Sequence, residues 1–281
     1  MKKRRLGSLL GLTLCALAVW IPLYLLLTGT LMSTGELNER IGMTLTGGDG
    51  YASWPLLPRW PTLKPLVHLL MDTPNFFPMF WNACLITIPT VLGQMVIASP
   101  AAWGLARGGF RGRKAVYLLY VALMLMPFQV LMVPSYLTLD KIGLLGTRWS
   151  VVFPSMFSTF PVFILYRFFA AIPETYVEAA ELDGANRLQV FTRIGLPMGM
   201  PGILAILVLG FIESWNALEQ PLTFIKDSSQ WPVSLFLSNI ATEDAGSAFA
   251  ASLITMLPVV LIFLWGKPYL EAGIRAGGVK E

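Results

Sequence analysis

Charge is scarce in this sequence. Only 13% of the 281 residues are charged, whereas 55% are hydrophobic. About a quarter of the residues of a soluble domain are charged. The shortage of charge therefore excludes an ordinary soluble domain and indicates a protein that lies in a lipid bilayer.

Cysteine and histidine are nearly absent as well. The two cysteines, Cys15 and Cys84, both lie in apolar runs and offer neither a disulfide framework nor a metal-ligand spacing. The single histidine, His68, is better suited to surface or packing than to catalysis. The sequence also lacks the Gly-x-x-x-x-Gly-Lys-Ser/Thr loop that cradles phosphates. We therefore expect no metal site and no ATP hydrolysis in this chain.

Long apolar runs dominate what is present. A membrane-spanning helix needs about 20 apolar residues, and six runs are candidates: 9–32, 80–105, 115–137, 147–170, 202–218 and 248–265. The first run follows Lys2-Lys3-Arg4-Arg5, as a secretory signal would, but it continues apolar to Leu31, which favours a retained span. The predicted fold class is an all-α integral membrane protein with six transmembrane helices.

Basic residues predict the orientation, because loops rich in Lys and Arg stay in the cytoplasm. With the N-terminus inside, the cytoplasmic segments hold most of the 20 basic residues. Both termini are then cytoplasmic, and nothing in the net charge of +4 calls for a nucleic acid. We predict a single transmembrane domain, 1–281, whose non-spanning parts are a cytoplasmic N-terminus (1–8), an outer loop (33–79), a cytoplasmic loop (171–201) and a cytoplasmic tail (266–281).

The outer loop 33–79 contains Gly47-Gly48-Asp49-Gly50 and several Pro-containing turns, which argue against regular structure before the aromatic stretch 76–81. Two interpretations stay open. The loop is either an external cap that packs on the helices or a docking surface for an outer partner.

The cytoplasmic loop holds the longest polar, helix-forming block of the chain. Pro173 suits the start of a helix, and Glu174 adds a negative charge where the helix dipole favours it. Gly184 stands where a left-handed terminator is expected. These signals predict a short helix over 173–183.

A second short helix is predicted directly afterwards. Asn186 and Gln189 have the spacing of a capping box, and Pro197 is expected to stop the helix. Val177, Ala180, Leu188, Phe191 and Ile194 are expected to face protein, and Glu178, Glu181, Arg187 and Arg193 to face solvent. A helical hairpin over 173–197 results, and a surface hairpin without any partner is one open interpretation.

The spacing in this hairpin resembles the cytoplasmic coupling motif of ABC importer permeases. That motif reads Glu-Ala-Ala, three residues, Gly, nine residues, Ile, one residue, Leu-Pro, and it is matched at Glu178, Ala179, Ala180, Gly184, Ile194, Leu196 and Pro197. The version with Leu182-Asp183-Gly184-Ala185 is similar to the carbohydrate-uptake branch. Trp215-Asn216, Met126-Pro127 with Pro134, and the ending 276–280 agree with the second permease subunit of maltose-type importers.

This resemblance implies a type I ABC importer in the cytoplasmic (inner) membrane of a bacterium or archaeon. The chain would form a heterodimer with a second permease subunit in the membrane lipid, two ABC ATPase subunits would bind beneath, and an extracytoplasmic solute-binding protein would deliver the solute. ATP and Mg would be held by the partner ATPase, and no cofactor by this chain. The helix 173–183 would dock into an ATPase groove, with Asp183 and the matched motif residues as coupling residues.

Polar residues inside a bilayer are expensive and therefore mark candidate solute paths. Here they are Asn82, Gln94, Gln129, Glu213 and Asn216, and Trp215 would stack on a sugar ring. Hydrogen bonding between helices is the competing interpretation for the polar residues, and interfacial anchoring for Trp215. A sugar or related polar solute is expected, and a glycerol phosphate or a polyol is the alternative.

A membrane enzyme is an alternative of another class. The stretch Asp183-Gly184-Ala185-Asn186-Arg187 is faintly similar to the Asp-Gly-x-x-Ala-Arg start of phosphatidyl-alcohol transferases. Their metal site needs several oxygen ligands, and the next aspartate after Arg187 is Asp227, far along the chain. A channel or secondary carrier would not need the cytoplasmic hairpin. We therefore expect that the chain is not an enzyme.

Overall fold

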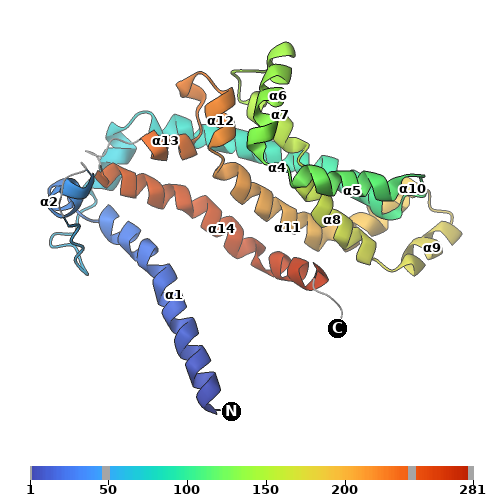
Figure 1. The fold of residues 1–281 in the computed structure, drawn as a ribbon, viewed down its shortest axis with the longest axis horizontal. Coiled ribbons are helices and arrows are strands. Elements are labelled where there is room, and N and C mark those ends of the chain that lie inside the picture. The colour runs from blue at the N-terminus through green and yellow to red at the C-terminus, as the bar shows by residue number, and fades with distance from the viewer. Residues whose placement is uncertain (1, 46–50, 240–244, 278–281) are drawn as a thin grey trace. The chain divides into compact units, whose positions relative to one another are not determined.

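A computed structural model describes residues 2–45, 51–239 and 245–277, so Gly47-Gly48-Asp49-Gly50 and the last four residues of the tail lie outside it. All regular elements in the described ranges are helices, which confirms the all-α prediction (Figure 1). They form two compact units, one of residues 1–78 and 236–257 and one of residues 79–235 and 258–281.

Helices account for most of the described residues. In order they are α1 (Lys2–Thr30), α2 (Thr34–Leu45), α3 (Lys64–Val67), η1 (His68–Asp72), α4 (Phe76–Arg107), α5 (Arg113–Met124), α6 (Phe128–Lys141), α7 (Trp149–Met156), α8 (Thr159–Ala171), α9 (Glu174–Leu182), α10 (Arg187–Val190), η2 (Phe191–Gly195), α11 (Leu196–Trp215), α12 (Glu219–Phe224), η3 (Ser228–Gln230), α13 (Val233–Asn239) and α14 (Ala245–Gly277).

Five helical runs in the described part of the chain are long and apolar enough to cross a membrane, and there are six if the bent pair α5 and α6 counts as one span. That pair occupies the predicted span 115–137 but bends by 100°. Pro127 is extended, with φ −67° and ψ 147°. Its ring also disfavours a helical conformation of the preceding residue, so the helix ends there and restarts. The membrane side of each terminus stays a prediction.

The prediction that the outer loop lacks regular structure before residue 76 is wrong, because α2, α3 and η1 lie within it. The longest of the three is α2. This helix begins after Ser33, whose hydroxyl accepts the backbone N–H of Glu36 at 3.3 Å. Leu37 and Ile41 of α2 are buried with Met32 in a small core that also includes Ala245. The Ser-x-x-Glu spacing is a helix-start signal, and it outweighs the glycines and prolines that follow.

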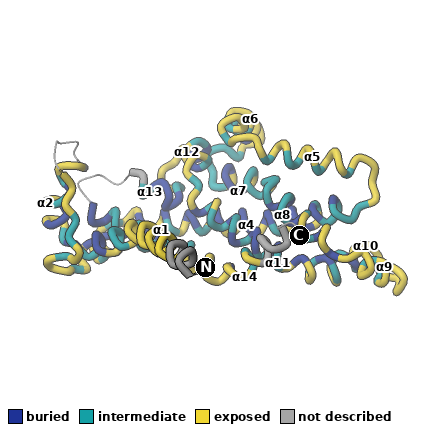
Figure 2. The backbone as a smooth tube through the Cα atoms, turned by 60° about the horizontal axis from the view of Figure 1, so that its bottom comes forward, coloured by how far each residue is buried: buried dark blue, intermediate teal, exposed yellow. Residues whose placement is uncertain are grey.

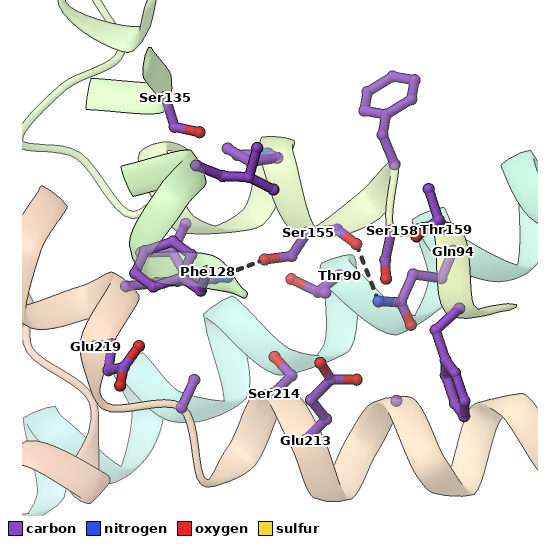
Figure 3. A pocket seen from close by; sticks show the side chains of 18 of the residues that line it. Thr90, Gln94, Phe128, Ser135, Ser155, Ser158, Thr159, Glu213, Ser214 and Glu219 are labelled. Atoms are coloured by element: carbon purple, nitrogen blue, oxygen red, sulfur yellow. Dashed lines mark hydrogen bonds between the residues drawn. The ribbon is translucent and has the colours of Figure 1, made fainter. Parts of the chain in front are cut away.

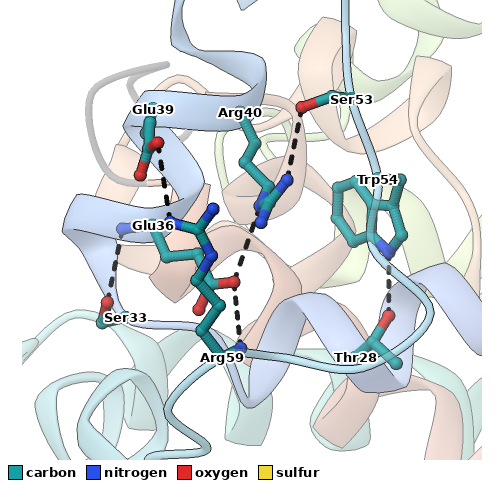
Figure 4. Close-up of polar contacts among 8 residues, drawn as sticks. All are labelled: Thr28, Ser33, Glu36, Glu39, Arg40, Ser53, Trp54 and Arg59. Atoms are coloured by element: carbon teal, nitrogen blue, oxygen red, sulfur yellow. Dashed lines mark hydrogen bonds and ion pairs between the residues drawn. The ribbon is translucent and has the colours of Figure 1, made fainter.

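The chain after α2 is held by a polar network (Figure 4). The buried carboxylate of Glu36 accepts the backbone N–H of Arg59 at 3.1 Å and pairs with Arg40 at 3.5 Å. The indole N–H of Trp54 donates to the hydroxyl of Thr28 at 3.0 Å. The segment is thus an ordered cap on α1 and α2, while its use as a docking surface stays untested.

The second unit is built around α4, α8 and α11. Ala102 of α4, Leu165 and Phe169 of α8, and Ile206 of α11 lie in one buried core. Small residues let these helices approach closely, as is usual in membranes. A Cβ added to Gly199 would lie 2.2 Å from the ring of Phe169. Within this unit, α9 and α10 lie at one end of these helices, and α6, α7 and α12 lie toward the other (Figure 1).

Candidate functional site

The first helix of the hairpin, α9, is nearly as predicted. It spans Glu174–Leu182, with Pro173 as its N-cap rather than its first residue. Gly184 adopts φ +83°, the left-handed conformation that favours glycine. The N–H of Ala185 donates to the carbonyl of Ala180 at 2.9 Å, and that of Gly184 to Glu181 at 3.0 Å. This pair of bonds is the Schellman arrangement, so the prediction that Gly184 ends the helix is confirmed.

The helix α9 exposes most of its surface, and none of its residues is buried (Figure 2). Glu178, Ala179 and Asp183 are exposed, and Ala180 is half-buried. Leu182 is 89% exposed and Tyr176 is 54% exposed. The exposed surface of α9 therefore combines the apolar side chain of Leu182 with the carboxylates of Glu178 and Asp183.

The second helix begins as predicted. The side chain of Asn186 accepts the N–H of Gln189, and that of Gln189 accepts the N–H of Asn186, both at 2.9 Å. The capping box is therefore confirmed. Leu188, however, is exposed rather than packed on protein.

The prediction that Pro197 stops this helix is wrong, because one helical run continues over Arg187–Trp215. A π-helical turn, η2, precedes α11, and Pro197 lies in the first turn of α11. A proline is tolerated in a first turn because its missing N–H is not needed there. Pro197 is exposed, while Ile194 and Leu196 are half-buried.

A cavity of about 630 Å³ lies in the second unit, lined from α4, α7, α8, α11 and α12 among others (Figure 3). Its polar lining consists of Thr90, Gln94, Ser135, Ser155, Ser158, Thr159, Glu213, Ser214, Glu219 and Gln220. Phe128, Phe157 and Phe160 are among its apolar lining residues. Ligand pockets commonly measure about 300–1,000 Å³ and combine apolar walls with a few polar groups. This cavity has that size, and most of its polar lining residues are serines and threonines.

Two of the predicted path residues, Gln94 and Glu213, are in this lining. Gln94 is the more buried of the two, at 4% exposed. Its amide nitrogen donates to the carbonyl of Ser155 at 2.9 Å and so joins α4 to α7. Its amide oxygen has no hydrogen-bond partner among the described residues. A Cβ added to Gly210 would lie 2.4 Å from that oxygen, so the glycine lets α11 approach the amide.

Two carboxylates, Glu213 and Glu219, give the cavity its charge. The carboxylate of Glu219 accepts the amide N–H groups of Gln129, with 2.9 Å to each oxygen. Gln129 is not in the lining, but its two hydrogen bonds hold the carboxylate of Glu219, which is. The described lining contains no Lys, Arg or His. The cavity is therefore negative.

The other three predicted path residues lie outside this lining. Asn82 is buried and donates to the carbonyls of Ser229 at 2.8 Å and Trp231 at 3.1 Å. Trp215 is 2% exposed and stacks on Phe211 at 5.4 Å between ring centroids. Asn216 donates to the carbonyl of Ile212 at 2.8 Å. The structure thus brings Gln94 and Glu213 together, and contact of any of the six with solute stays a prediction.

Sequence reasoning missed the hydroxyl groups of the cavity, such as Ser155, Ser158 and Thr159. The signal was present, because these residues lie between Pro154 and Pro161 in an otherwise apolar run. The chain breaks there between α7 and α8. It also missed Glu219 and Gln220, which directly follow the predicted span 202–218.

Comparison with known proteins agrees with this geometry. Residues 94–276 match the family of binding-protein-dependent transport system inner membrane components. The chain belongs to this family. It is therefore a multi-pass permease of an ABC importer in the inner membrane, a transport component rather than an enzyme, and the resemblance inferred from the hairpin spacing is confirmed.

Three similar proteins illustrate the match. The inner membrane ABC transporter permease protein YcjP of Escherichia coli is 28% identical over 98% of this chain and 96% of its own length. The multiple sugar-binding transport system permease protein MsmG of Streptococcus mutans is 32% identical over 78% and 81%. The arabinooligosaccharides transport system permease protein AraQ of Halalkalibacterium halodurans is 27% identical over 78% and 80%.

A solved structure shows the same fold. A chain of a bacterial ABC transporter involved in the import of the acidic polysaccharide alginate superposes with a TM-score of 0.79, covering 96% of this chain and 98% of that one, at 19% identity.

Proposed function

We propose that this permease forms part of the path for an uncharged sugar or oligosaccharide, and that α9 couples the path to a partner ATPase. The observation that carries the proposal is that one compact unit holds both an exposed, glycine-terminated helix with the coupling motif and a cavity rich in hydroxyl groups.

The chemistry of the cavity supports a sugar. A sugar ring offers hydroxyl groups around its edge and apolar C–H faces. Serine, threonine and glutamine side chains pair with the former, and phenylalanine rings pack on the latter. The names of MsmG and AraQ describe transport of multiple sugars and of arabinooligosaccharides by those proteins.

The charge of the cavity argues against a glycerol phosphate. Phosphate is usually bound by Arg, Lys or backbone N–H groups, and the described lining has no basic side chain. The carboxylates of Glu213 and Glu219 in the lining would repel it, since like charges repel each other. A polyol remains compatible with the same lining.

A phosphatidyl-alcohol transferase activity lacks support for a similar reason. Among the described residues, no three His, Cys, Asp or Glu side chains group closely enough to hold a metal ion. Asp183, which carried that alternative, caps the C-terminus of the exposed helix α9.

The expected assembly follows from the proposed coupling. A second permease subunit would complete the path, two ATPase subunits holding ATP and Mg would bind the cytoplasmic face, and a solute-binding protein would dock outside. The exposed Leu182 suits an apolar groove, while Glu178 and Asp183 suit basic groups or backbone N–H donors at its rim.

The test is ATP-driven uptake by the complex with its own ATPase and solute-binding protein in proteoliposomes. The probes are radiolabelled neutral di- and trisaccharides, with glycerol 3-phosphate and a uronate disaccharide for comparison. We expect uptake of a neutral saccharide only, and its loss when Leu182→Glu prevents ATPase binding. Uptake that persists without any ATPase subunit would overturn the coupling role, and uptake of the anions alone would overturn the solute class.

A further inference from the structure

Arg107, the last residue of α4, contacts the end of another helix. Its guanidinium donates from Nε and Nη2 to the carbonyl of Phe169, at 3.3 and 3.0 Å, and from Nη2 to the carbonyl of Ile172. The last carbonyls of a helix have no intrahelical donor, and positive charge is favourable at that end of the dipole. Arg107 therefore caps α8 from outside.

This cap lies next to the hairpin. Only Ile172 and Pro173 separate α8 from α9, and Ile172 is itself buried in the core. Because Pro173 is the N-cap of α9, the arginine holds the backbone one residue before that N-cap.

The second arm of the hairpin, the helical run that begins at Arg187, also packs on α4. It contacts Trp103, which lies one turn before Arg107 on the same face of that helix. The indole of Trp103 lies 5.8 Å from the ring of Phe191, between centroids, and meets Phe169 edge-on at 5.4 Å. A Cβ added to Gly195 would lie 2.8 Å from the indole ring. Phe191 and Gly195 are the first and last residues of the π-helical turn η2, so Trp103 contacts both ends of that turn.

The same helix reaches the cavity. Gln94 of α4 lines the cavity and donates to the Ser155 carbonyl of α7, and Arg107 is thirteen residues later in the sequence. At 1.5 Å per residue this separates the two side chains by roughly 20 Å along one helix.

We propose that Arg107 and Trp103 form a clamp that fastens both arms of the hairpin to α4, so that displacement of α9 by the ATPase moves α4 and the wall of the cavity. The inference rests on the proposed coupling role of α9. It makes Arg107 a positioning residue, which touches neither solute nor ATP.

An arginine suits this task better than a lysine. Its planar guanidinium presents several N–H donors in a fixed arrangement and bridges two carbonyls at once, whereas a lysine ammonium is a point charge on a flexible stem. Arg113 provides a matched control. It donates to the carbonyls of Ala106 and Gly108, close to its own position in the chain, and among the described residues it makes no hydrogen bond to α8 or to the hairpin.

The test measures whether ATP still changes the cavity. Cys15→Ser and Cys84→Ala leave no native thiol in this chain, and Ser158→Cys reports from the cavity lining. In the complex with its ATPase, the labelling of this chain by a water-soluble maleimide is followed after the subunits are separated on a gel. Couplings between two sites are typically 5–150-fold. We therefore expect Mg-ATP to change the rate at least ~5-fold in this parent complex, and Arg107→Ala to abolish the change while ATP hydrolysis continues.

Further variants separate coupling from folding. Arg113→Ala should keep the full response, and Arg107→Lys should restore part of it. Arg107→Gln, which keeps an amide NH2 group as donor but carries no charge, is measured in parallel in case Arg107→Ala fails to assemble. A full ATP response in Arg107→Ala or Arg107→Gln would overturn the clamp. A parent complex without any ATP response would overturn the proposed function itself.

Discussion

Single residues in the second unit show how close the helices lie. The amide oxygen of Gln94 has no partner among the described residues, and Gly210 of α11 lies so close that a Cβ added to it would meet this oxygen. A buried acceptor without a donor costs about 1–3 kcal/mol. That cost is tolerated at sites that bind something, and a sugar hydroxyl would provide the missing donor.

Gly210→Ala tests this packing. The added methyl would lie 2.4 Å from the Gln94 oxygen, so α4 and α11 must separate, and we expect a loss of about 1–3 kcal/mol of stability. Gly104→Ala is the control, because Gly104 lies in α4 with nothing within 4 Å of its added Cβ. There a gain of about 0.5–1 kcal/mol is expected. Thermal unfolding of the purified protein in detergent distinguishes them, and equal shifts would contradict the packing argument.

Gly184→Val tests the hairpin turn. The space around Gly184 is open, but its φ of +83° is strained for a β-branched residue. We expect about 1–2 kcal/mol of local destabilisation, faster amide hydrogen exchange over 174–186, and weaker ATP-dependent uptake.

Two controls accompany this variant. Gly184→Asn should be milder, because asparagine tolerates the left-handed conformation. Gly109→Val, at an exposed glycine with open space and no positive φ, should leave the hairpin unchanged. Hairpin exchange rates that rise as much in Gly109→Val as in Gly184→Val would remove the conformational explanation.

Whole elements depend on short polar turns, of which η3 is the clearest. The carboxylate of Asp227 accepts the Ser229 hydroxyl at 2.7 Å and the Ser229 N–H at 2.9 Å, with Gln230 nearby at 3.4 Å. The carbonyls of Ser229 and Trp231 in turn accept the amide of Asn82 from α4. This turn therefore holds the chain after α12 against α4.

The turn should weaken in acid. The bonds from Ser229, followed by that from Gln230, lower the pKa of Asp227 below its ordinary value. A lowered folded pKa means that the stabilisation is complete above the ordinary Asp pKa and is lost as the pH falls through the lower folded value. Hydrogen exchange at the Ser229 amide should therefore show falling protection in that acidic range. Asp227→Asn should remove this pH dependence, and if the variant titrates as the parent does, another group is responsible.

At the scale of the whole molecule, the bent pair α5 and α6 sets the number of membrane crossings. If α5 and α6 form one broken span, Arg111 and Asp140 lie on opposite sides of the membrane. If they form a re-entrant loop, both lie on the same side. The bend of 100° permits either arrangement.

Sidedness can be measured directly in a background without Cys15 and Cys84. We expect a membrane-impermeant maleimide applied to spheroplasts to label Asp140→Cys and to leave Arg111→Cys unlabelled until the cells are opened, as the distribution of basic residues predicts. Labelling of both positions from outside would refute the six-span topology with cytoplasmic termini.

The sequence by itself determined the membrane class, the helical fold, the two caps of the hairpin and the family. These depend on composition and on residues a few positions apart, such as Asn186 with Gln189, or Gly184 at the end of α9. Local backbone sterics and nearby hydrogen bonds decide such features, so neighbouring residues suffice to predict them.

Only the tertiary structure decided which polar residues meet. In the sequence, all four of Asn82, Gln94, Glu213 and Asn216 are polar residues in or beside apolar runs. In the structure, Gln94 and Glu213 line the cavity, whereas Asn82 and Asn216 donate hydrogen bonds to backbone carbonyls. The continuation of the helix through Pro197 and the contacts of Arg107 with α8 could not be predicted from the sequence either. A polar group within a membrane protein takes whichever partner the packing of distant helices brings near, and that partner is set by the fold as a whole.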